Sequence, residues 1–130
     1  MIGARPSILL IEDDESLRTI VARQLRRLRY DVVEAASAEE ATDRLGLGDR
    51  PALVLLDLNL PGDTGWDLVR GPAFADAGSP PVVITSALTV NPKRLAELGV
   101  AGYLPKPFAI ETLVDTVERL IQLERVPGER

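Results

Sequence analysis

The feature that most constrains the fold of this chain is a regular alternation between short apolar runs and amphipathic stretches. Residues 7–11, 52–56 and 81–84 form mostly apolar runs, which are typical of strands covered on both faces of a sheet. Residues 14–29 instead repeat apolar side chains at helical spacing. Because strands that alternate with helices form parallel sheets with crossover helices, the pattern predicts a sheet with helices on both faces.

The remaining elements extend the same alternation to the end of the chain. Further strands are expected at residues 30–35 and 102–104, and further helices at 37–47, from Trp66 to a stop at Gly71-Pro72, at 91–99 and from Ile110 onward. The 130 residues fit one domain, at residues 1–125, followed by a polar tail at residues 126–130. The predicted fold is a flavodoxin-like, doubly wound (βα)5 three-layer sandwich with a five-stranded parallel sheet.

Composition excludes several classes of chemistry. The chain has no cysteine and no histidine, so thiol nucleophiles, Ser-His-Asp catalysis and Cys- or His-ligated metals are absent, and a metal would need oxygen ligands. Its net charge of −5 argues against direct nucleic-acid binding, which requires neutralisation of phosphates. No apolar run approaches the length of a membrane span, so we expect a cytoplasmic protein with no membrane contact.

Polar side chains follow four of the expected strands, at the end where doubly wound folds place their sites. They are Glu12 and Asp13, then Asp57, then Thr85 and Ser86, and finally Lys106. Clustered carboxylates repel one another and a bare phosphate, and they are stabilised by a shared cation such as Mg²⁺. An ammonium and a hydroxyl beside a carboxylate nucleophile are the parts of a phosphoryl-transfer site.

The chain resembles the receiver domain of bacterial two-component response regulators, and in particular the chemotaxis regulators. The resemblance rests on several short motifs that occur in the same order and at the ends of the expected strands. The motifs are Glu12-Asp13, Asp57 with Leu60-Pro61-Gly62 and Gly65 after it, a hydroxyl after Val82-Val83-Ile84, and Lys106-Pro107-Phe108. The resemblance covers nearly the whole chain. It implies a Mg²⁺-dependent phosphoacceptor that changes conformation on phosphorylation, rather than an enzyme acting on a separate substrate.

The resemblance also implies roles for single residues. Asp57 would accept the phosphoryl group, and Lys106 would pair first with its carboxylate and then with the phosphoryl group. Magnesium would be held by Glu12, Asp13, Asp57 and the backbone carbonyl of Asn59. The peptide bond before Pro107 is commonly cis in this family.

Two further roles concern the hydroxyl and an aromatic switch. Ser86-Ala87 fits the family frame of a hydroxyl followed by alanine, but Thr85 takes its place if the strand begins one residue earlier. Successive strand residues point to opposite faces, so one of the two hydroxyls should face the phosphoryl group, and we favour Ser86. Tyr103 lies where the family has a switch aromatic, which follows the hydroxyl residue inward on phosphorylation.

The expected partners are a sensor histidine kinase or phosphotransfer protein and a downstream output protein or domain. A homodimer is possible, although the short helix at residues 91–99 puts the usual dimer mode of the family in doubt.

Three other functions fit the sequence less well than a receiver domain does. A haloacid-dehalogenase-type phosphatase would carry an acid where Asn59 stands, a flavodoxin-like nucleotide binder would not place acids after the first strand, and a degenerate receiver would lack some of the key residues.

Overall fold

The structure is a computed structural model that describes residues 5–60 and 65–125. The expected turn at Pro61-Gly62-Asp63 and the tail at residues 126–130 lie outside the described residues. The strands are β1 (Ser7–Ile11), β2 (Asp31–Ala35), β3 (Leu53–Asp57), β4 (Val82–Ser86) and β5 (Gly102–Pro105). The helices are α1 (Glu15–Arg27), α2 (Ala38–Gly46), α3 (Gly65–Arg70), α4 (Pro72–Asp76), α5 (Pro92–Leu98) and α6 (Ile110–Arg125).

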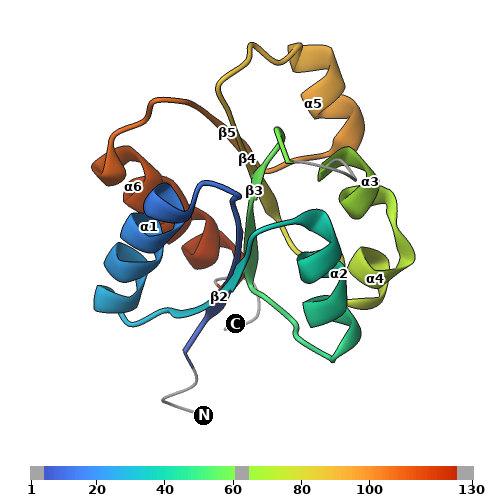
Figure 1. Ribbon diagram of the computed structural model, residues 1–130, viewed down its shortest axis with the longest axis horizontal. Coiled ribbons are helices and arrows are strands. Elements are labelled where there is room, and N and C mark those ends of the chain that lie inside the picture. The colour runs from blue at the N-terminus through green and yellow to red at the C-terminus, as the bar shows by residue number, and fades with distance from the viewer. Residues whose placement is uncertain (1–4, 61–64, 126–130) are drawn as a thin grey trace.

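The five strands form one parallel sheet in the order β2-β1-β3-β4-β5, which confirms the predicted fold. Helices α1 and α6 cover one face of the sheet, and α2, α3, α4 and α5 lie on the other (Figure 1). The order reverses direction at β1, so the carboxyl ends of β1 and β3 meet at a topological switch point, where sites of doubly wound folds form.

Both faces of the central strands are buried, which explains why their sequences are continuously apolar. In β1, Ile8 and Leu10 pack with the side chains of α1 and α6, whereas Leu9 and Ile11 pack with those of α2 and α3. Leu25 of α1 is fully buried against the first group. Burying a leucine of this kind contributes about 1.5–3 kcal/mol, so this core holds the strand ends in fixed positions.

Local signals in the sequence set the helix ends. Ser37 accepts a hydrogen bond from the backbone N–H of Glu40 at 3.1 Å, and Asn91 accepts one from the backbone N–H of Lys93 at 2.8 Å, so both side chains cap their helices. Gly99 ends α5 in the left-handed conformation, with φ of 68°.

The prediction that Gly71-Pro72 stops the helix around Trp66 is confirmed, because α3 ends at Arg70. The sequence analysis did not predict the next element, since Pro72 is the first residue of a second short helix, α4. Proline suits this position because the first helical N–H has no intrahelical partner and because its fixed φ is already helical. None of the helices in the described part of the chain is long and apolar enough to cross a membrane.

Candidate functional site

Asp57 is the last residue of β3, at the centre of the sheet's carboxyl edge, and it is only 2% exposed. Its Oδ1 accepts a hydrogen bond from the backbone N–H of Asn59 at 2.9 Å. Its Oδ2 accepts one from Nζ of Lys106 at 3.3 Å. This carboxylate is held in one orientation by hydrogen-bond partners on both of its oxygens.

Lys106 also forms the shorter ion pair of the site, with Oε1 of Glu12 at 2.8 Å. The other carboxylate oxygen of Glu12 accepts a hydrogen bond from the backbone N–H of Asp14 at 3.2 Å. The pKa of Glu12 is raised from 4.5 to about 7, mainly by burial and to a smaller extent by the nearby Asp57, against the opposing effects of Lys106 and of the bond from Asp14. One ammonium therefore does not fully compensate two buried carboxylates.

The pKa of Lys106 lies above its ordinary value of 10.5. Burial alone would lower it, but the hydrogen bond and charge of Glu12, together with those of Asp57, outweigh that effect. The lysine is therefore a permanent cation over the physiological pH range. It follows β5 directly, and the peptide bond between Lys106 and Pro107 is cis, as the resemblance implied.

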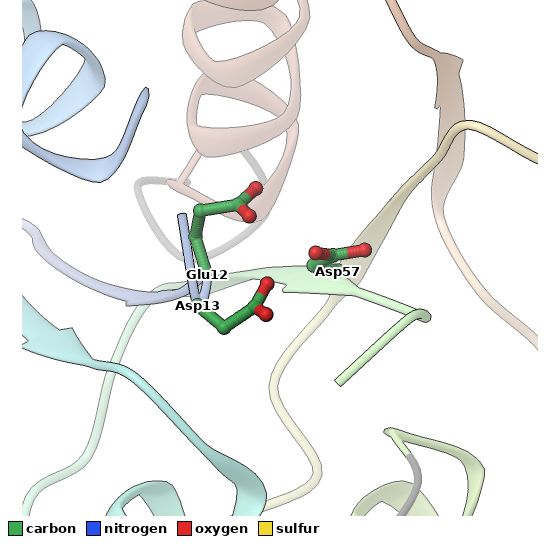
Figure 2. A group of neighbouring side chains, drawn as sticks. All are labelled: Glu12, Asp13 and Asp57. Atoms are coloured by element: carbon green, nitrogen blue, oxygen red, sulfur yellow. The ribbon is translucent and has the colours of Figure 1, made fainter. Parts of the chain in front are cut away.

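A third carboxylate, that of Asp13, completes an acidic cluster at the switch point. Oxygen atoms of Glu12, Asp13 and Asp57 all lie within 4.8 Å of one another. Figure 2 shows them around a common space between the ends of β1 and β3, with Asp13 on the solvent side. Three carboxylates against one ammonium leave an excess of negative charge, and an all-oxygen donor set of this size suits Mg²⁺.

The two candidate hydroxyls lie in different surroundings. The Oγ of Ser86 accepts hydrogen bonds from the backbone N–H of Leu88 at 3.0 Å and from the side-chain amide of Asn59 at 3.4 Å. Thr85 is the β4 partner of Asp57 in the sheet register, but it lines a small cavity among apolar side chains of α1 and α6, including Val21. Ser86 thus faces the loop that follows the acceptor strand, and Thr85 faces the core beneath it.

The predicted switch aromatic, Tyr103 of β5, is half-buried. Its hydroxyl donates a hydrogen bond to the backbone carbonyl of Leu88 at 3.1 Å, two residues beyond Ser86. Beside this loop, the Arg94 guanidinium lies 5.1 Å from the ring centroid of Trp66 and joins α5 to α3. Ser86 and Tyr103 are thus both hydrogen-bonded to the backbone of Leu88.

One contact at this site was not expected from the sequence. Arg18 of α1 donates a hydrogen bond from Nη1 to the backbone carbonyl of Glu12 at 2.8 Å. A backbone acceptor leaves no trace in a residue pattern, and Glu12 lies before α1 begins, so helical spacing gives no signal for this contact either.

Known proteins are similar to this chain in both sequence and fold. A family model for the response regulator receiver domain matches residues 8–118. Response regulator MprA of Mycolicibacterium vanbaalenii is 34% identical over 117 residues, which cover 88% of this chain and 50% of that protein. This chain spans about half the length of the curated relatives it matches.

Solved structures of response regulators also have the fold of this chain. The non-phosphorylated HemR receiver domain from Leptospira biflexa is similar with a TM-score of 0.79 and 34% identity, covering 90% of this chain and 94% of that one. Chemotaxis response regulator CheY4 of Vibrio cholerae is similar with a TM-score of 0.79 and 28% identity, covering 90% and 99%.

Proposed function

Because the chain belongs to the response regulator receiver domain family, we propose that Asp57 accepts the phosphoryl group in its two-component signalling. The observation that carries this proposal is the buried Asp57 carboxylate, bonded to Lys106 on one oxygen and lying in a cluster of three acids. The donor would be a phosphohistidine of a sensor histidine kinase or of a phosphotransfer protein.

In the transfer step, a carboxylate oxygen of Asp57 attacks the phosphorus of the donor. The bond between phosphorus and the imidazole nitrogen breaks, and its electron pair stays on that nitrogen. Lys106, already 3.3 Å from the carboxylate, would pair with an oxygen of the transferred group. The site thus contributes a positioned nucleophile and fixed charge, which are the main requirements of phosphoryl transfer.

The metal of this family fits the residues present, because every donor in the cluster is a carboxylate oxygen and the cluster carries excess negative charge. Glu12 and Asp13 would hold Mg²⁺, with Asp57 and the backbone carbonyl of Asn59 as further ligands. Bound there, the ion would neutralise charge on the transferred phosphoryl oxygens. The hydrogen bond from the Asn59 N–H to Asp57 supports this assignment, since it holds that backbone beside the acceptor.

Ser86 is the hydroxyl that we assign to the phosphoryl group. Among the described residues its Oγ accepts hydrogen bonds from Leu88 and Asn59, and a hydroxyl that accepts two bonds can still donate its hydrogen to a phosphoryl oxygen. Movement of Ser86 toward a phosphoryl oxygen would pull on the Leu88 loop, to which the hydroxyl of Tyr103 is bonded. That loop would couple phosphorylation to the position of Tyr103.

In the cell, the chain would act as a switch in the cytoplasm rather than as an enzyme with a separate substrate, although it would assist its own phosphorylation and dephosphorylation. Its output would be contact with a downstream protein or domain, without direct binding to nucleic acid, and a homodimer is one form this output could take. The short α5 of seven residues would then call for a contact different from the usual one.

Peptide mapping tests the assignment of the acceptor. The protein is incubated with acetyl phosphate and Mg²⁺, the acyl phosphate is reduced with borohydride, and the modified residue is identified by tandem mass spectrometry. We expect the modification at Asp57 alone. Modification at Glu12 or Asp13 instead would contradict the proposed roles of the three acids.

A further inference from the structure

The side chain of Arg18 in α1 makes hydrogen bonds both to the loop that follows β1 and to strand β2. Its Nη1 donates to the backbone carbonyl of Glu12 at 2.8 Å, and its Nε donates to Oε1 of Glu34 in β2 at 3.2 Å. Its side chain is 17% exposed and that of Glu34 is 30% exposed. The guanidinium is therefore fixed between the edge strand β2 and the loop that carries Asp13.

We propose that Arg18 is a positioning residue for the metal site, which it serves by fixing the peptide group that joins Glu12 to Asp13. The inference rests on the proposed function, because it assumes that these two acids hold Mg²⁺. Arg18 would not touch the ion or the phosphoryl group. It would act through the backbone, by keeping two carboxylates at the spacing that the ion requires.

The planarity of the peptide group gives the mechanism. The carbonyl of Glu12, the N–H of Asp13 and both Cα atoms lie in one plane, so fixing the carbonyl also fixes the N–Cα bond of Asp13. Only rotation about that bond then remains to set the direction of the Asp13 side chain. The N–H of Glu12 is held as well, by the backbone carbonyl of Ala35 at 3.0 Å. With Arg18 in place, the peptide groups on both sides of Glu12 are anchored to β2, directly on one side and through Glu34 on the other.

The chemistry of arginine suits this task better than that of lysine. A guanidinium is planar and presents donors in several fixed directions, so one side chain can bind Glu34 and the Glu12 carbonyl together. A lysine has a single flexible ammonium at the end of its stem. Arg18→Lys would therefore keep the positive charge and lose much of the geometry.

The direction of the change in Mg²⁺ affinity on replacing Arg18 distinguishes a positioning role from a purely electrostatic one. Arg18 is a cation near a site for another cation, so its charge alone repels Mg²⁺. If only charge mattered, Arg18→Ala would bind Mg²⁺ more tightly and Arg18→Lys would bind it as the native protein does. If Arg18 positions the loop, both variants bind the ion more weakly.

The test is a titration with Mg²⁺ alone, followed by calorimetry, on the native protein, Arg18→Ala and Arg18→Lys. Loss of a residue that orients metal ligands typically costs 10–100-fold in affinity, and we expect the lower end, about 10-fold, because Arg18 holds backbone rather than a ligand atom. The midpoint of thermal unfolding without metal is measured in parallel, to report any general loss of stability.

Arg26→Ala is the matched control. Arg26 lies on the same helix and also pairs with Glu34, at 3.0 Å, but its other hydrogen bond goes to the backbone carbonyl of Val32. Its removal deletes the same charge and one partner of the same glutamate. We expect its Mg²⁺ affinity to stay within about 2-fold of the native value, as is usual for substitutions away from a site.

A second readout separates affinity from chemistry. The rate of phosphorylation by acetyl phosphate is measured over a range of Mg²⁺ concentrations for the native protein and Arg18→Lys. We expect the half-saturating Mg²⁺ concentration to rise about 10-fold in Arg18→Lys, with the rate at saturation within about 2-fold of native. A purely structural defect would lower the saturated rate and leave the half-saturation point in place.

Each result of the Mg²⁺ titrations either supports or overturns the positioning role of Arg18. Weaker binding in both Arg18 variants, with an unchanged Arg26→Ala, supports the proposal. Unchanged or tighter binding in Arg18→Lys overturns it while leaving the proposed function intact, and so does an equal loss in Arg26→Ala. If the native protein itself binds no Mg²⁺, the assignment of the metal site fails and this inference fails with it.

Discussion

Replacing Glu12 by glutamine should stabilise the magnesium-free protein above neutral pH. Glu12 is 4% exposed, and its burial raises its pKa to about 7. Above that pH the folded protein must carry a charged carboxylate that Lys106, shared with Asp57, does not fully compensate. Glutamine has nearly the same shape and keeps an oxygen to accept from Lys106, but it carries no charge to bury.

The size of the effect follows from the two pKa values. The pKa is about 7 in the folded protein and 4.5 in the unfolded chain. One pKa unit corresponds to about 1.36 kcal/mol, so ionised Glu12 reduces the free energy of unfolding by roughly 3 kcal/mol at pH 8. For a domain of this size, each kcal/mol raises the melting temperature by about 4 °C, so Glu12→Gln should melt roughly 12 °C higher.

The stability difference between the native protein and Glu12→Gln should change with pH. Between pH 4.5 and 7 the folded protein binds a proton at Glu12 that the unfolded chain has released. The stability of the native protein relative to Glu12→Gln therefore falls as pH rises through this range, and it is constant above and below it. Urea unfolding of both proteins in EDTA, at half-unit steps from pH 4 to 8, measures this difference directly.

The same experiment on Glu39→Gln, an exposed acid of α2, supplies the control and should give a difference close to zero at every pH. A Glu12→Gln variant less stable than the native protein at pH 8 would refute the reasoning. So would a stability difference between the two proteins that does not vary between pH 4.5 and 7, since ionisation of Glu12 would then carry no cost.

Three other substitutions give further tests. Lys106→Ala leaves two buried carboxylates without their ammonium and should lose about 3 kcal/mol in urea unfolding at pH 8, part of it recovered by Mg²⁺; no loss would contradict the ion pairs. Ser86→Ala should slow phosphorylation by acetyl phosphate about 10-fold or more, whereas Thr85→Val should change it less than about 2-fold, as followed by Trp66 fluorescence. The reverse order would exchange the roles of these two residues. Gly99→Ala should lower the free energy of unfolding by about 1 kcal/mol because of the positive φ, and an unchanged melting curve would exclude strain there.

Much of the fold could be predicted because the central strands β1, β3 and β4 are short, mostly apolar runs. Such runs are typical of strands buried on both faces of a sheet, and the polar residues at their ends mark its carboxyl edge. This is why Asp57 and Lys106, 49 residues apart in sequence, could be expected at one site before any distance was known.

The details that escaped prediction depend on geometry that short-range patterns do not encode. Gly71-Pro72 ends α3 as predicted, but α4 was missed: proline also begins helices, and the buried Phe74 of α4 packs in the core. The choice between Ser86 and Thr85 depended on where β4 begins, which is Val82. The bond from Arg18 goes to a backbone carbonyl and could not be inferred from residue types.

The most direct test of the central claim is the intact mass of the protein after incubation with acetyl phosphate, with and without Mg²⁺, for the native chain and Asp57→Asn. The account predicts a gain of one phosphoryl group by the native protein only when Mg²⁺ is present, and no gain by Asp57→Asn. The same gain in Asp57→Asn, or a gain by the native protein that does not require Mg²⁺, would contradict it.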